Sequence, residues 1–443
     1  MKSYSIWSDF QRKDLKRLSS DINCDVLIIG GGITGCGMYY HLYKNFNTIL
    51  VEQNKIGDGV TARSTGKLTF MQNDLLDKIR KQSVSKASLY LKSQIDAIKI
   101  IKKIIKEENI KCDLEKTDSI IYTNKEEEIN KIKDLKSFLS SCDIKVDDYK
   151  TDLVKMKYAI VAHDTYIFNP SLFVYQYLKD KSNVYEDTKI IDIKRKENLY
   201  CCYTKDHVIK AKYVIVASHY PYFNIPYFLP IKSYLEKSYL LAGSKNHEPI
   251  SLISYSNPFV SIRTYKNKMI YLSNSLDSYK NIDDSKNFEE LLKKTSDIGL
   301  FPTYLWTNTD IMTNDNLPYI GKIKKNMFIA TGYNTWGLTN GILSGKIISD
   351  ILLKKKNPYI ELFDPKRINL KKELNIILNI SKNFLGYMNG FLKHNNHYFC
   401  THMHCPVIYN KNENTYDCPC HGSRFDINGD VIVSPANKNL KIK

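Results

Sequence analysis

Apolar residues along the chain follow three different spacings, and each spacing predicts a different kind of element. Val26 to Ile29 form a short continuous apolar run, which is typical of a buried parallel strand, and Thr48 to Val51 are its expected partner. Five further apolar residues recur at helical spacing and predict one packed helix face: Leu91, Ile95, Ile98, Ile101 and Ile105. Residues 251–275 instead alternate as antiparallel strands do.

The length of the chain permits several domains. Its 443 residues are enough for two or three units with ample cores. The first residues, MKSYSIWSDFQRKDLKRLSS, lack the charged segment and apolar core of a signal peptide, and no run of about 18 apolar residues occurs anywhere. We therefore expect a cytoplasmic protein without a transmembrane segment.

The formal net charge of +18 raises the question of nucleic acid or an anionic membrane surface as a partner. The lysines are spread along the chain beside abundant Ile, Asn and Tyr instead of forming a patch. We interpret the charge as an ordinary solvated surface and expect no nucleic-acid binding.

A glycine motif lies between the two expected parallel strands, in CDVLIIGGGITGCGMYYHLYKNFNTILVEQ (residues 24–53). Gly30, Gly32 and Gly35 fit GxGxxG, which allows a tight turn, backbone approach to a pyrophosphate and close packing of helix on strand. Glu52 follows at the end of the second strand, where a carboxylate accepts hydrogen bonds from a ribose diol. The motif predicts a dinucleotide site. It occurs once, so a second such domain for NAD(P) is not expected.

Five other segments resemble the D-amino-acid oxidase or glycine oxidase-like superfamily: IGDGVTARSTGKLTF (56–70), VIVASHYPYF (214–223), NDNLPYIG (314–321), ATGYNTWGLTNG (330–341) and ELFDPKR (361–367). This resemblance implies that the dinucleotide is FAD. The first segment would lie along the flavin, and the third and fourth would cover its pyrimidine side. The resemblance thus implies eight further cofactor-binding residues: Arg63, Ser64, Thr65, Lys67, Gly332, Trp336, Gly337 and Thr339.

Cysteine and histidine gather near the end of the chain, in FCTHMHCPVIYNKNENTYDCPCHGSRF (residues 399–425). In a reducing compartment, clustered cysteines more often bind metal or do redox chemistry than form structural disulfides. Cys400, His402, Cys418 and His421 fit C-x-H-x15-C-x2-H, and this pattern resembles the ligand set of a Rieske [2Fe-2S] centre. Zinc is the alternative that four such ligands leave open.

The Rieske resemblance carries further implications for the residues around these ligands. It implies a disulfide between Cys405 and Cys420 that ties the two ligand loops together, a pair for which zinc would not account. Ser423 lies where the family's serine donates to a cluster sulfur, and Phe425 replaces a tyrosine donor of the high-potential members, which implies a lower potential. His404 replaces a glycine, and we interpret it as a neighbour of the cluster or a solvent-facing residue.

Together the two resemblances cover nearly the whole chain and match a bacterial group of FAD-dependent oxidoreductases with a Rieske domain. They imply an α/β (α+β overall) protein with a Rossmann-type FAD-binding domain, an antiparallel-sheet substrate subdomain and a small all-β Rieske module. The expected boundaries are 1–367 for the oxidoreductase domain (fingerprint 25–53, substrate subdomain roughly 105–150 and 230–305), 368–392 for a helical connector and 393–443 for a shortened Rieske module.

The resemblance predicts an enzyme that oxidises a small amine or amino-acid-like substrate at the flavin and relays electrons through the cluster to or from a one-electron protein partner. No residue stands out as a catalytic acid or base. Arg263 could meet a substrate carboxylate, although we favour a surface or packing role. Two alternatives stay open: a redox-sensing or electron-carrier protein without substrate turnover, and a degenerate binding protein that has lost its cluster.

Overall fold

The computed structural model describes residues 2–220, 232–256, 259–277, 284–367, 385, 388, 398–420, 422–433, 435–436 and 438–442, without the side chains of 274–277. The expected helical connector lies almost entirely outside these residues. His421 also lies outside them. Within the described part of the chain, no helix has both the length and the apolar character that crossing a membrane requires.

The first sheet is built around the strand that precedes the glycine motif. β1 (Ile22–Ile29) lies between β10 (Val208–Val216) and β2 (Thr48–Val51), and the parallel order continues through β17 (Met327–Thr331) on one side and β7 (Val184–Tyr185) on the other. Three antiparallel strands complete it: β16 (Tyr319–Lys324), β8 (Asp192–Lys196) and β9 (Leu199–Tyr203). The predicted pairing of the first two apolar runs is confirmed.

Helices cover this sheet and pack closely where glycine permits. α1 (Ile33–Leu42) meets α7 (Gly337–Leu352) so tightly that a Cβ atom on Gly345 would lie 2.2 Å from the carbonyl oxygen of Gly37. The predicted helix face belongs to α3 (Val84–Glu107), in which Leu91, Ile98 and Ile101 are buried in the largest core. The shorter helices are α2 (Leu75–Arg80), α5 (Pro170–Leu178), α8 (Tyr359–Phe363), η1 (Ile6–Ser8) and η2 (Val60–Arg63).

The second sheet has nine strands, in the order β15 (Phe301–Thr313), β11 (Ser233–Ser244), β14 (Lys268–Asp277), β13 (Val260–Tyr265), β12 (Ser251–Ser254), β4 (Glu115–Thr123), β6 (Tyr158–Ile167) and β3 (Lys67–Leu68), with β5 (Val146–Asp148) on β6. The antiparallel strands predicted from residues 251–275 are β12, β13 and β14. Also in this part of the chain are α4 (Ile129–Ser141), η3 (Glu126–Glu128) and α6 (Asp284–Asp297).

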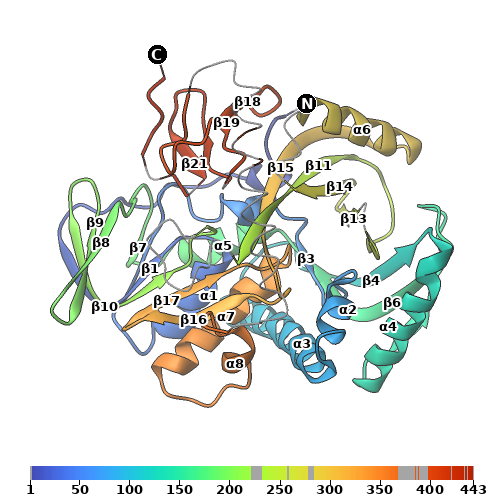
Figure 1. The fold of residues 1–443 in the computed structure, drawn as a ribbon, viewed down its shortest axis with the longest axis horizontal. Coiled ribbons are helices and arrows are strands. Elements are labelled where there is room, and N and C mark those ends of the chain that lie inside the picture. Colours follow the sequence, from blue (N-terminus) through green and yellow to red (C-terminus); the bar gives the residue numbers. More distant parts are fainter. Residues whose placement is uncertain are drawn as a thin grey trace.

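The described residues from 398 onward, called here the C-terminal module, form a small antiparallel sheet with its own core. Its strands are β18 (Ile408–Asn410), β19 (Thr415–Asp417), β20 (Arg424–Phe425) and β21 (Val431–Val433). The four cysteines of the module pack in this core together with Phe425, which is fully buried. Figure 1 shows the module, in red, beside β11 and β15 of the second sheet.

Candidate functional site

The glycine motif forms a turn that other residues could not make. Gly30 has a φ of +118°, and a Cβ atom there would lie 2.8 Å from the carbonyl oxygen of Ala217. A Cβ atom on Gly35 would lie 1.9 Å from the carbonyl oxygen of Gly30, so only glycine lets α1 approach β1 this closely. The turn therefore points the N-terminus of α1 at the space in front of it, where backbone amides can receive phosphate oxygens.

Two polar side chains stand beside this turn. The Glu52 carboxylate accepts hydrogen bonds from the amides of Gly31 (2.7 Å) and Asn54 (3.0 Å), and burial raises the pKa of Glu52. Thr61 accepts a hydrogen bond of 2.9 Å from the Ile33 amide in the first turn of α1. Thr61 was not predicted as a site residue.

A large cavity, called here the main cavity, extends from this turn to the second sheet. Its empty volume is about 1710 Å³, open mouth included. Ten of the twelve predicted cofactor-binding residues line it: Gly30, Gly32, Glu52, Arg63, Ser64, Thr65, Lys67, Trp336, Gly337 and Thr339. Gly35 and Gly332 do not, because Gly35 supports the α1 packing and a Cβ atom on Gly332 would instead meet Thr313.

The segment expected to lie along the flavin is held from behind by buried polar contacts. Lys67 donates to the Leu252 carbonyl (2.8 Å) and the Ser261 hydroxyl (2.7 Å), and burial, with Arg263 nearby, lowers the pKa of Lys67 well below its ordinary value. Arg263 is fully buried and donates to the carbonyl oxygens of Thr65 (3.1 Å) and Gly66 (2.6 Å). Of the surface or packing role that we favoured for Arg263, the structure shows the packing role.

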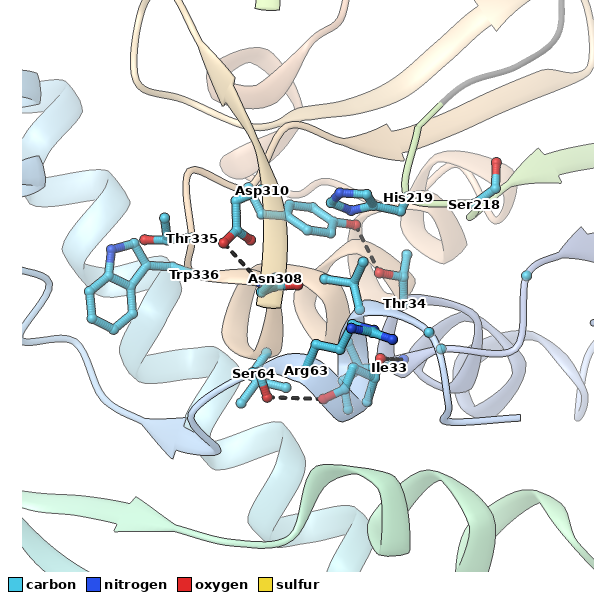
Figure 2. Close-up of a pocket in the computed structure, with 18 of the residues that line it drawn as sticks. Ile33, Thr34, Arg63, Ser64, Ser218, His219, Asn308, Asp310, Thr335 and Trp336 are labelled. Atoms are coloured by element: carbon cyan, nitrogen blue, oxygen red, sulfur yellow. Dashed lines mark hydrogen bonds between the residues drawn. The ribbon is translucent and has the colours of Figure 1, made fainter. Parts of the chain in front are cut away.

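The opposite wall contains polar residues that sequence analysis did not single out (Figure 2). Asn308 donates to the Asp310 carboxylate at 2.9 Å, and burial together with the charge of Glu236 raises the pKa of Asp310 to about 7. Burial lowers the pKa of His219 to about 4, and its Nε2 donates to the Thr309 carbonyl at 2.7 Å. A charged residue inside the strand YLWTNTDIMT was the available signal for Asp310.

In the C-terminal module, two loops bring together Cys400 and Cys418, two of the four predicted cluster ligands. Cys405 and Cys420 form a disulfide between the loops, with 6.4 Å between their Cα atoms. The sulfur atoms of this pair and of Cys418 all lie within 4.8 Å of one another. Cys400 and Cys418 are buried and do not take part in a disulfide.

The surroundings of Cys400 favour its thiolate. Interaction with the Cys418 thiol, against the opposing effect of burial, lowers the pKa of Cys400 to about 7, and the His402 amide and Ser423 hydroxyl add to the lowering. The Ser423 hydroxyl also accepts from the Ala436 amide at 2.9 Å, which leaves its own proton available to the sulfur. His402 is partly buried, whereas His404 is exposed. A thiolate with donors around it is the form that binds iron.

The module is joined to the rest of the protein by six charged side chains, three of each sign: Arg63, Lys237, Asp284, Glu413, Asp417 and Arg424. Arg63 contacts Glu413 at 2.9 Å, and Arg424 contacts Glu413 at 2.8 Å. Burial opposes ionisation of Glu413, but Arg424 and Arg63 outweigh it and lower the pKa of Glu413 to about 2. Because Arg63 also lines the main cavity, the network connects the module directly to that cavity.

The module also forms part of the cavity wall. Ile432 and Val433 of β21 line the main cavity, and Asn54 donates to the Ile432 carbonyl at 3.3 Å. One strand, β15, lies between the main cavity and the cluster loops. Asn308 and Asp310 line the main cavity, whereas Thr309 lines a second cavity with Cys418 and Ser423.

The fold and the two sites define an FAD-dependent oxidoreductase that carries a Rieske iron-sulfur domain. Residues 25–351 match the family of FAD dependent oxidoreductases, and residues 394–442 match the Rieske [2Fe-2S] domain. The first match covers more than half of the chain, which therefore belongs to the FAD dependent oxidoreductase family.

Three known proteins illustrate this relationship. The chain is 30% identical to the Rieske 2Fe-2S iron-sulfur protein YhfW of Bacillus subtilis (strain 168) over 479 positions, which cover 96% of this chain and 94% of that protein. It is 24% identical to gamma-glutamylputrescine oxidoreductase of Escherichia coli (strain K12), over 76% of this chain and 85% of that protein. The structure of glycine oxidase from Geobacillus kaustophilus shares the fold, with a TM-score of 0.65, 16% identity, and 78% of this chain and 99% of that chain covered.

The oxidoreductase domain binds FAD and the Rieske domain binds a [2Fe-2S] cluster. Features of the structure fit both groups. A Cβ atom on Gly32 would meet one atom, the Thr61 hydroxyl oxygen at 3.0 Å, so the turn leaves room in front of α1. The buried thiols of Cys400 and Cys418 beside a disulfide fit the cluster. The assignment of individual ligand residues stays a prediction.

Proposed function

We propose that the protein oxidises a small amine or amino-acid-like substrate in the main cavity and passes the electrons through its Rieske cluster to a one-electron protein partner. The single observation that carries the proposal is the one-strand separation of the two sites by β15. The names of two relatives support the substrate class, since one is a gamma-glutamylputrescine oxidoreductase and the other a glycine oxidase.

The same proposal assigns ligands to each group. FAD is held by the turn of Gly30, Gly32 and Gly35, by Glu52, by Arg63, Ser64, Thr65 and Lys67, and by Gly332, Trp336, Gly337 and Thr339. The cluster is held by Cys400, His402, Cys418 and His421. Each set is supported by the cavity wall and by the paired loops described above, with His421 outside the described residues.

The bound ammonium first releases one proton to solvent. The free amine then loses a hydride from the carbon next to nitrogen and leaves as an iminium ion, which water hydrolyses. Bound FAD supplies a two-electron acceptor that can release electrons singly, and the cluster carries one at a time. The protein supplies orientation and the exclusion of water. Trp336 and Tyr333 line the cavity, and the Tyr333 hydroxyl is held by Thr34 and Ser344, each at 3.1 Å.

The test is an anaerobic screen of amines and amino acids, with bleaching of the oxidised-flavin absorption band as the first signal and reduction of cytochrome c as the second. A substrate should produce both signals in the wild-type protein. The Cys418→Ser protein should keep the bleaching and lose most of the cytochrome c reduction. If no compound bleaches the flavin while a reduced protein partner does, the protein is an electron carrier without substrate turnover.

A further inference from the structure

The charges that line the main cavity are unusual for a site that would receive an amino acid. Among the described residues of the cavity wall, the side chains able to carry positive charge are Arg63, Lys67 and His219. The acidic ones are Glu52 and Asp310. An amino-acid carboxylate needs an available cation, preferably an arginine that binds both oxygens.

Each of the three basic side chains is already committed. Arg63 pairs with Glu413 at 2.9 Å and donates to the Thr307 carbonyl at 2.9 Å, so its charge is neutralised from behind. Lys67 donates to the Leu252 carbonyl and Ser261 hydroxyl, and burial disfavours its charged form. His219 is neutral near pH 7, because burial lowers its pKa to about 4. None of them presents an unpaired positive charge to a substrate carboxylate.

The two acids lie at different parts of the cavity. Glu52 stands at the glycine turn, where Gly31 and Asn54 donate to it, so its place is with the cofactor's ribose. Asp310 comes from β15 and lines the cavity beside Asn308 (Figure 2). Asp310 accepts a hydrogen bond from Asn308 and lines the cavity, and a carboxylate can accept further hydrogen bonds through its remaining lone pairs.

A second acid increases the negative potential at this point. Glu236 of β11 lies directly opposite Asp310 in the register of β11 and β15. Like charges at opposed positions of neighbouring strands repel each other, and this repulsion together with burial raises the pKa of Asp310 to about 7. A cation bound next to Asp310 would offset the repulsion from Glu236 and would stabilise the buried carboxylate in its charged form.

We infer that Asp310 is the specificity-determining residue of the main cavity and that it selects a cationic amine without a carboxylate next to the nitrogen. The inference rests on the proposed function and narrows it to one substrate class. The Asp310 carboxylate receives the substrate ammonium, and Asn308 holds that carboxylate in place. A zwitterionic amino acid would bring its own carboxylate to a wall whose described basic side chains are already paired or neutral, which costs affinity.

Ligands that cannot be oxidised test this inference apart from turnover. The carbon attached to nitrogen in tert-butylamine and 2-aminoisobutyrate carries no hydrogen, and pivalate has the same shape without nitrogen. The three compounds are therefore a cation, a zwitterion and an anion of similar size. Each is titrated into the FAD-loaded, full-length protein, and its dissociation constant is measured from the change in the flavin absorption spectrum.

The wild-type protein should bind tert-butylamine at least about tenfold more tightly than either other compound. Asp310→Asn should weaken tert-butylamine binding by about ten- to a hundredfold, as expected for a charged hydrogen bond. The Asp310→Asn protein should bind pivalate at least as tightly as the wild-type protein does. Asp310→Glu keeps the charge and should keep the preference, and Asp152→Asn, which changes an exposed carboxylate, should change nothing. Flavin content is measured for each variant, and the dissociation constants are compared on loaded protein only.

Three results overturn the inference: tighter binding of 2-aminoisobutyrate than of tert-butylamine, unchanged tert-butylamine binding in Asp310→Asn, or no spectral change with any compound. The proposed reaction fails separately. If tert-butylamine binds through Asp310 but no oxidisable amine bleaches the flavin, the inference stands and the proposed function falls. If amino acids bleach the flavin equally well in the Asp310→Asn protein, the proposed function stands and the inference falls.

Discussion

The main cavity and the cluster loops are built from very different amounts of the chain. The described loop residues that approach the cluster site lie between Cys400 and Ser423, so one short stretch supplies them. The main cavity takes residues from Ile29 to Val433, and these come from both large sheets and from the C-terminal module. The cluster site is local in sequence, whereas the cavity depends on the whole fold.

This difference determines what each site tolerates. A local site depends mainly on its own ligands, so that losing one ligand should spare the rest of the molecule. The cavity depends on contacts between distant segments, and the Arg63–Glu413 contact joins it to the module. Four changes test how independent the two sites are.

The largest expected effect is on the cluster. Cys418→Ser removes a thiolate, so iron and acid-labile sulfide should fall from about two each per chain to near zero. FAD should remain bound, because the oxidoreductase domain has its own core. Metal and sulfide analysis beside flavin absorption checks this, with Cys142→Ser, a partly buried cysteine on α4's C-terminal end, as the control. Loss of FAD together with iron would show that the sites are not independent.

The next change should remove the flavin from the main cavity and spare the cluster. Gly32→Val places a branched side chain in front of α1, in the space kept for a pyrophosphate, and should reduce bound flavin to a small fraction of the wild-type amount. Gly32→Ala should lose less. Flavin released on denaturation is the measurement, and iron content should stay unchanged. A fully flavin-loaded Gly32→Val protein would contradict the proposed cofactor position.

A smaller effect is expected at the network that joins the two regions. Glu413→Gln leaves Arg63 and Arg424 without their shared carboxylate and should cost about 3–5 kcal/mol of unfolding free energy. Glu248→Gln, at an exposed position, should cost almost nothing. Chemical denaturation followed by both cofactor spectra measures the difference. Equal stability of the two variants would show that the network does not hold the module.

The Glu413 carboxylate also predicts that the stability of the protein depends on pH. Its pKa in the folded protein is lowered to about 2, below the value of about 4.3 for an unfolded glutamate. Its contribution to stability is therefore fully present above about pH 5 and is lost as the pH falls towards 2. Glu413→Gln should show less loss than the wild-type protein over this range. Parallel losses would assign the acid sensitivity to other groups.

The smallest expected effect is a shift of the cluster potential. Phe425→Tyr would restore the hydroxyl donor that the Rieske resemblance leads one to expect, and one hydrogen bond of about 1 kcal/mol corresponds to about 40 mV for a one-electron couple. The potential should rise by roughly that amount. Tyr416→Phe, which changes the residue paired with Phe425 across β19 and β20, is the matched control and should leave the potential unchanged. A fall in potential would contradict the assigned donor position.

The spacing of apolar residues and glycines was sufficient to predict those elements whose interacting residues lie close together along the chain. The glycine turn, its two parallel strands, the α3 face and the antiparallel strands of residues 251–275 all follow from local periodicity. The pairing of β4 with β12, by contrast, joins segments more than 100 residues apart, and no local pattern specifies it. Long-range pairing depends on the whole core, so it could not be read from any single window.

The same limit applies to the sites. The predicted residues of the cavity come from motifs, and ten of the twelve line it, yet the motifs say nothing of Glu413, which is 350 positions from its partner Arg63. Asp310 was missed because a lone acid in a strand resembles a solvent-facing residue until the fold shows which space it faces. The sequence identified cofactor motifs, but the substrate wall needed the structure.

The covering of the cavity by β21 has a consequence for how the protein assembles. Ile29 and Val433 line one cavity from opposite ends of the chain, and closing so large a loop is slow compared with forming local structure. The pocket should therefore be completed late in refolding, after the parallel sheet has formed. FAD that is present from the start of refolding would bind before β21 has packed over the cavity. FAD should therefore dissociate more slowly from the fully folded protein than from the refolding intermediate.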